Sequence, residues 1–241
     1  MNRIKGLILA GALLATAVLP VQAFAQTTAA IKYGDVAKGE LTNSISSLSY
    51  TFKAEANDVV VLKMKQDGLD SSVSPSLAVA DSNKQSVADT TKQSNYSTAT
   101  LVFTVTAAGA YTIVAGTTDK TKIGKFQLAL SKAEVLKAGV ATNGHATSEQ
   151  PAYYTYTSGD PFSISYAKQA GDFTPDVNVN KVSDDKSLSQ VAYIGGNLLR
   201  AGSATISPSS NQAFIISVES ALFDFNSKVT ADFTLQVDIA K

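Results

Sequence analysis

A pattern of alternating apolar residues occurs twice in this chain, about one hundred positions apart, and it constrains the fold more than any other feature. In its first occurrence, residues 101–116, Leu101, Phe103 and Val105 alternate with other residues, as in a half-buried strand. A short Ala-Ala-Gly segment then interrupts the alternation, and its glycine accepts the positive φ that many tight turns need. The pattern predicts a hairpin with Gly109 in its turn. It further predicts that Gly109→Val damages folding of the first copy and leaves the second copy largely intact.

The second occurrence, residues 204–220, belongs to a repeat that runs through most of the chain. Matching segments occur in the same order, at spacings of 100 to 107 residues. They pair Gly39–Asn43 with Gly139–Asn143, Tyr50–Phe52 with Tyr154–Tyr156, Val60–Met64 with Phe162–Tyr166, Pro75–Val79 with Pro175–Val179, Tyr111–Ile113 with Phe214–Ile216, and Phe126–Leu130 with Phe233–Val237. The spacing changes where loops are expected, because insertions are tolerated there. The sequence therefore predicts two tandem copies of one unit.

Each copy is expected to be an antiparallel β-sandwich of the jelly-roll type. Thr, Ser, Val, Tyr and Phe are abundant, and short apolar runs are separated by polar turns rather than by helical patterns. We expect a lead-in at Thr27–Lys38 and a linker at Ser131–Ala138. The predicted organisation is all-β, with domains at residues 26–132 and 133–241.

Residues 1–25 are predicted to be a cleaved signal peptide. A short basic head precedes the apolar run Gly6–Pro20, and Ala23-Phe24-Ala25 fits a cleavage site before Gln26. The run is shorter than the ~20 residues that span a bilayer, and no cysteine is present for a lipoprotein anchor. We expect a periplasmic or secreted protein without a membrane span in the mature chain.

The charge balance argues against a nucleic-acid partner. Lys and Arg total 20, as do Asp and Glu, and Arg3 and Lys5 lie in the predicted leader. The mature chain is therefore slightly acidic and lacks a basic patch. Without cysteines, stability must come from packing alone.

The first copy resembles the bacterial pre-peptidase C-terminal domain. The resemblance is carried by Ser49–Phe52, the turn Asn57-Asp58, a valine-rich strand, Leu69-Asp70 before Pro75–Leu77, the segment Ala107–Ile113, and Gly124–Leu128. It spans about residues 33–131, and the second copy, about 137–240, is diverged, with Asn211-Gln212 in place of the glycine of the turn.

This resemblance implies a jelly-roll-like sandwich that serves as a non-catalytic accessory module for secretion, targeting or binding. Some relatives hold calcium through acidic loops. Here the corresponding segment, Ala88–Thr91, carries a single acid, Asp89, so no calcium cofactor is expected. A calcium site formed by the turn aspartates is the alternative. Its candidates are Asp67, Asp70, Asp81 and Asp89 in the first copy, and Asp172, Asp176, Asp184 and Asp185 in the second. Solvated turn aspartates explain the same residues without a metal.

The sequence offers few candidate residues for catalysis. His145 is the single histidine, expected in a loop at residues 143–146, and the nearby Ser148 and Glu149 form no known nucleophile motif. We expect an exposed loop histidine, and the sequence assigns no catalytic, cofactor-binding or metal-binding residue.

Four tyrosines gather in the second copy and raise the possibility of a sugar-stacking platform. The repeat places Tyr154, Tyr156 and Tyr166 on the core face, so only Tyr153 is expected to point outward.

The sequence thus favours an exported, non-enzymatic binding protein whose partner is a protein or polysaccharide outside the cell or in the envelope. A structural or adhesin subunit that assembles through its edge strands is the alternative. A hydrolase is the least favoured function.

Overall fold

The computed structural model describes residues 29–68, 70–90, 97–183, 187–195, 200–220 and 229–240. The predicted signal peptide, Asp184 and Asp185 lie outside these residues. The strands are β1 (Ala29–Ala30), β2 (Val36–Leu41), β3 (Ser47–Ala54), β4 (Val59–Gln66), β5 (Pro75–Ala80), β6 (Ser86–Asp89), β7 (Thr98–Thr104), β8 (Gly109–Thr117), β9 (Gly124–Lys132), β10 (Glu134–Val135), β11 (Thr142–Thr147), β12 (Ala152–Ser158), β13 (Phe162–Gly171), β14 (Pro175–Val182), β15 (Leu188–Ile194), β16 (Ala201–Ile206), β17 (Gln212–Ser220) and β18 (Thr230–Ile239).

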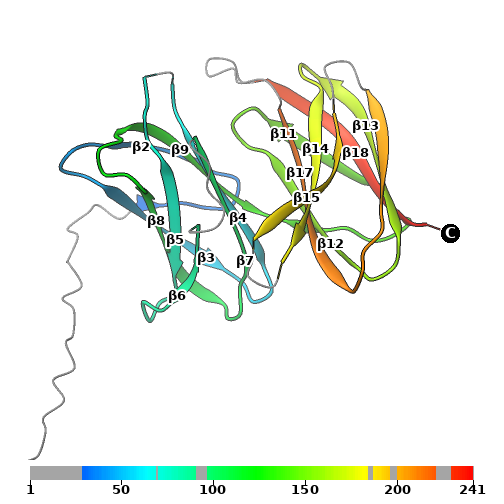
Figure 1. The fold of residues 1–241 in the computed structure, drawn as a ribbon, viewed down its shortest axis with the longest axis horizontal. Helices are drawn as coiled ribbons and strands as arrows, with labels where there is room; N and C mark the ends of the chain where they lie inside the picture. The colour runs from blue at the N-terminus through cyan, green and yellow to red at the C-terminus, as the bar shows by residue number, and fades with distance from the viewer. Residues whose placement is uncertain are drawn as a thin grey trace, which may run out of the picture.

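These strands form four sheets in two sandwiches that lie side by side (Figure 1). The first sandwich pairs the sheet β1-β3-β8-β5-β6 with β2-β9-β4-β7, and the second pairs β10-β12-β17-β14-β15 with β11-β18-β13-β16. The strand order of the second sandwich repeats that of the first. All pairings are antiparallel except β1 with β3 and β10 with β12. The all-β sandwich prediction is confirmed.

Each sandwich has its own apolar core. In the first, Val60, Leu62 and Met64 of β4 are fully buried against the inward residues of the facing sheet. In the second, aromatic rings dominate, and Phe162 makes edge-on contacts with Tyr156 and Phe214. The apolar residues that alternate along each strand in the sequence are the ones that point inward and fill these cores.

The predicted hairpin at residues 101–116 is wrong. β7 pairs with β4 in one sheet, whereas β8 pairs with β3 and β5 in the other. The chain crosses between the sheets near Val105, whose backbone exchanges hydrogen bonds with Asn57 and Asp58. Gly109 lies at the start of β8 without a positive φ, and a Cβ there would meet open space. The alternation identified both strands, but two neighbouring strands can pair with each other or face each other across a core.

The predicted lead-in and linker are also wrong, because both contain strands. Residues 27–38 include β1 and the start of β2, and residues 131–138 include β10. The backbone N–H of Ala133 donates to the Val59 carbonyl, and that of Leu136 donates to Thr155. The last strand of the first sandwich therefore leads directly into the first strand of the second. These strands are too short to leave a clear alternation in the sequence.

One match in the repeat also needs correction. Gly39 pairs with Phe126 on β9, and the residue that pairs with the equivalent Phe233 on β18 is Gly144. The counterpart of Gly39 is therefore Gly144, five residues beyond the predicted Gly139. Gly139 lies in a turn with a φ of +74°. Among the residues that the structure describes, no helix has the length and apolar character to cross a membrane.

Candidate functional site

The two sandwiches pack face to face through an apolar cluster that is separate from both cores. The first sandwich contributes Val61 and Val102 from the outer face of β4 and β7, and the second contributes Tyr153 and Ile215 from β12 and β17. All four side chains are buried. Because Val60 and Val61 point to opposite faces of β4, this strand is buried on both sides. We call the surface where the two sheets meet the interface.

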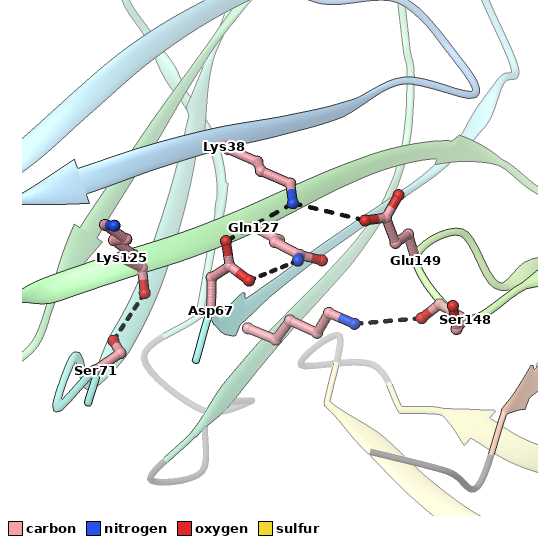
Figure 2. A network of polar contacts seen from close by, with 8 residues as sticks. Lys38, Asp67, Ser71, Lys125, Gln127, Ser148 and Glu149 are labelled. Atoms are coloured by element: carbon pink, nitrogen blue, oxygen red, sulfur yellow. Dashed lines mark hydrogen bonds and ion pairs between the residues drawn. The ribbon is translucent and has the colours of Figure 1, made fainter. Parts of the chain in front are cut away.

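A polar network also joins the two sandwiches (Figure 2). Lys38 of β2 lies 3.6 Å from a Glu149 carboxylate oxygen and 3.9 Å from one of Asp67. The buried Gln127 amide donates to Asp67 at 2.8 Å. Lys65 donates from Nζ to the backbone carbonyl of Ser148 at 3.2 Å.

Further contacts cross the interface in addition to this network. The Gln150 amide donates to Ser131 Oγ at 2.7 Å and to the Leu130 carbonyl at 3.3 Å. Lys63 pairs with Glu219 of β17. Burial lowers the pKa of Lys65, and the neighbouring positive charge of Lys63 lowers it further. Together with the apolar cluster, these bonds hold the sandwiches in one relative orientation.

The interface covers only part of the outer face of the β10-β12-β17-β14-β15 sheet. One row of outward side chains crosses this sheet, and in register it runs Tyr153, Ser217, Asn178, Tyr193. The first sandwich buries Tyr153 at one end, whereas Tyr193 at the other end is 51% exposed. We call the uncovered area beside the interface the junction face. It consists of Asp176, Asn178, Gln190, Tyr193 and Glu219.

Tyr193 has a defined orientation although it is exposed. Its hydroxyl donates to Asp176 Oδ1 at 2.7 Å, and this hydrogen bond, with a smaller effect of burial, raises the pKa of Tyr193. The phenol end of the ring lies directly over Gly195, where a Cβ would collide with it. The absence of a side chain at position 195 therefore lets the ring lie against the backbone.

The remaining side chains of the junction face are linked to one another. The Gln190 amide donates to Asn178 Oδ1 at 3.0 Å, and the Asn178 amide donates to Glu219 Oε1 at 3.2 Å. Ser217 Oγ donates to the same carboxylate oxygen at 3.1 Å. Because Glu219 also pairs with Lys63, the junction face is tied to the first sandwich.

The structure separates the residues considered for catalysis. His145 lies on strand β11 rather than in the predicted loop, and its Nδ1 is 2.7 Å from Asp232 Oδ1 on an exposed sheet face. Ser148 and Glu149 belong to the interface network instead. His145 therefore belongs to an exposed His–Asp pair, apart from Ser148 and Glu149.

The candidate calcium ligands are spread over both sandwiches. Asp67 belongs to the interface, Asp81 accepts backbone N–H bonds in its own turn, and Asp172 faces the backbone of Thr230. Asp70 and Asp89 are exposed, and Asp176 belongs to the junction face. Within the described ranges, no group of three or more His, Asp or Glu residues could hold a metal ion.

The predicted orientations of the four tyrosines agree with the structure, but the predicted exposure of Tyr153 does not. Tyr154, Tyr156 and Tyr166 lie in the second core, as predicted. Tyr153 points away from that core, as predicted, but it is buried at the interface and burial raises its pKa. The residue that the sequence analysis missed is Tyr193. The sequence signal for Tyr193 was an aromatic residue between Ala192 and Ile194, which both point inward on the same strand. Gly195 follows Ile194 directly.

No family model matches the chain, and no curated protein sequence matches it. Among solved structures, the pre-peptidase C-terminal domain of a collagenase from Bacillus anthracis aligns with a TM-score of 0.36 and 14% identity, covering 44% of this chain and 96% of that domain. The tandem CBM22 domains of Xyn10C from Paenibacillus barcinonensis align with a TM-score of 0.27 and 12% identity, covering 85% and 86%. The PBSX exported protein XepA aligns with a TM-score of 0.25 and 9% identity, covering 85% and 87%.

Proposed function

We propose that this chain is an exported, non-catalytic binding protein, periplasmic or secreted, that holds its partner at the junction face. The observation that carries the proposal is Tyr193, an aromatic ring that is half exposed and yet fixed by Asp176 and Gly195. Exposed and preorganised aromatic side chains lose little conformational entropy on binding and are enriched at recognition sites.

The proposal leaves out catalysis. His145 pairs with a carboxylate on an exposed face, and the serine and glutamate nearest to it in sequence are engaged elsewhere. General acid–base chemistry at this histidine would need a positioned nucleophile or a second catalytic group. A binding role uses the features that the chain does present.

A structural subunit that assembles by stacking its outer sheet faces, as distinct from pairing its edge strands, is less well supported. The sandwiches pack head to tail, so the free face of each carries the counterparts of interface residues. Tyr153 and Ile215 correspond to Ser49 and Thr112 on the free face of the first sandwich. Val61 and Val102 correspond to Ser163 and Thr205 on that of the second. Polar outer faces of this kind end a stack of repeats rather than extend it.

The mature protein and its Tyr193→Ala variant test the proposal in a pull-down on peptidoglycan, chitin and collagen. We expect retention of the wild type on at least one matrix and loss of retention in the variant. Val140→Ala is the matched control, because Val140 is similarly exposed but lies outside the junction face. Equal retention of wild type and Tyr193→Ala would contradict the assignment of the site. Activity in a hydrolase panel that disappears in His145→Ala would contradict the non-catalytic assignment.

A further inference from the structure

We propose that the junction face binds a neutral polysaccharide, with a pyranose ring stacked on Tyr193 and its hydroxyls hydrogen-bonded by the side chains of Asn178 and Gln190. This inference rests on the proposed function, since it names the partner class for the same site.

The ring of Tyr193 is held in a geometry that suits stacking. One end of Tyr193 rests on the backbone of Gly195 and its hydroxyl is held by Asp176, while half of the side chain remains open to solvent. A pyranose presents a flat face of C–H groups that needs an apolar surface of about one aromatic ring. A fixed ring with an open side provides that surface without a further ordering cost.

Polar side chains that can bind hydroxyl groups surround the ring. Asn178 stands directly opposite Tyr193 in the β14–β15 register, so their Cβ atoms are about 4.5–5.5 Å apart. Gln190 and Glu219 each hydrogen-bond Asn178. An amide has two N–H donors and a carbonyl oxygen that accepts two bonds. In these contacts each amide donates one N–H, and the Asn178 carbonyl accepts one bond, which leaves capacity for ligand hydroxyls. Paired hydroxyls on adjacent sugar carbons match such planar groups.

The charge and the small apolar area of the junction face disfavour other classes of partner. Asp176 and Glu219 make the junction face unsuitable for a polyanion, although Lys63 compensates Glu219. Val191, at a bulge of β15, is the exposed apolar neighbour of Tyr193 on the same strand. One ring and one valine supply much less apolar area than a stable protein interface buries in its centre. An uncharged, hydroxyl-rich chain suits this combination best.

The edge position of β15 also suits a polymer. In the part of the chain that the structure describes, β15 is the last strand of its sheet, so the junction face reaches the sheet edge on one side and the interface on the other. A long chain can pass over an open edge, whereas a closed cavity would accept only its end. The site therefore fits an internal segment of a polysaccharide.

Affinity electrophoresis and calorimetry with soluble β-glucan, mannan and chitooligosaccharides test this inference. We expect binding of at least one saccharide by the wild type and a loss of about tenfold or more in Tyr193→Ala, as for removal of a central aromatic contact. Tyr193→Phe should lose less, because it keeps the stacking surface. Asn178→Ala tests the hydrogen-bonding arm, and Val140→Ala is the control. Thermal melts identical to that of the wild type establish that each variant is folded.

Three results would overturn the inference. The first is unchanged saccharide affinity in folded Tyr193→Ala. The second is retention on collagen that depends on Tyr193 without binding of any saccharide, and in this case the binding function would stand while the polysaccharide assignment would fail. Absence of Tyr193-dependent binding to any matrix or saccharide would contradict both proposals.

Discussion

Gly39 lies so close to the ring of Phe126 that a Cβ at this position would come within 2.5 Å of the phenylalanine Cζ and 2.7 Å of Leu48 Cδ1. The two residues are directly paired between β2 and β9, and the ring fills the space above the glycine. The second sandwich repeats the arrangement with Gly144 and Phe233. The repeat therefore preserves a specific contact in addition to its apolar rows.

Replacing Gly39 with alanine should destabilise the first sandwich by about 1–3 kcal/mol, because the new methyl group must displace a buried ring. Urea denaturation of the mature protein measures this loss. Gly109→Ala is the matched control, since its Cβ would enter open space and its φ is not positive. It should leave stability unchanged or raise it by about 0.4–1 kcal/mol, because alanine gives the unfolded chain less conformational entropy than glycine does. Equal losses in both variants would contradict the packing argument.

The relation between Gly39 and Gly144 also shows where sequence reasoning reached its limit. Matches built on buried rows, such as Leu62 with Ile164, agree with the register of the structure. The glycine match was off by five residues because the entering strands carry few apolar residues to align. Periodicity identifies a strand and its inward face, but it does not identify the strand's partner. For that reason β7 and β8 were predicted as a hairpin although they belong to different sheets.

The interface was missed for a related reason. Alternation separates the two faces of a strand, and an outward side chain such as Tyr153 is then expected in solvent. In this chain the outward face of one sheet meets that of another. The run of three valines at 59–61 was a usable signal, because a strand buried on both faces shows a continuous apolar run. The fold was predictable from local patterns, whereas the binding candidate Tyr193 required knowing which outward positions remain uncovered.

Tyr153→Ser should uncouple the two sandwiches. Serine is the residue at the corresponding position 49, and truncating a buried aromatic side chain costs about 3–5 kcal/mol. Calorimetry of the wild type should give one cooperative transition, and that of the variant two separate transitions. Val140→Ser, at an exposed position, should keep one transition. A single unshifted transition in Tyr153→Ser would show that the interface contributes little to stability.

The polar free faces should prevent the protein from stacking into chains, and reversing them should allow it. A variant with Ser49→Tyr and Thr112→Ile on one face and Ser163→Val and Thr205→Val on the other carries both halves of a copied interface. Light scattering should then show assemblies larger than the monomer that increase with concentration, because each head-to-tail contact leaves a further contact face at either end. Variants altered on one face alone should stay monomeric, since each contact needs both halves. Growth of a single-face variant would contradict the head-to-tail model.

Asp58 should make the stability of the first sandwich sensitive to acid. Burial alone would raise the pKa of this carboxyl, but hydrogen bonds from Lys132, the Glu55 backbone and the Tyr33 hydroxyl outweigh it, and the pKa lies below its usual value. The unfolded carboxyl titrates near pH 3.9, so the contribution is complete above about that pH. It is lost as the pH falls through the lower folded pKa.

Asp58→Asn should therefore lower the free energy of unfolding by about 1.5–3 kcal/mol at pH 7, the usual contribution of hydrogen bonds to a charged group, because the half-exposed Lys132 ammonium is solvated once its partner is removed. The difference from the wild type should shrink as the pH falls below about 3.9, because the unfolded carboxyl then becomes protonated, and it should disappear below the lower folded pKa, where the carboxyl is protonated in both states. Guanidinium denaturation at pH 7 and pH 2.5 measures both values. Asp70→Asn, at an exposed position, is the control and should change little at either pH. A difference for Asp58→Asn that stays constant with pH would show that its charge does not carry the stabilisation.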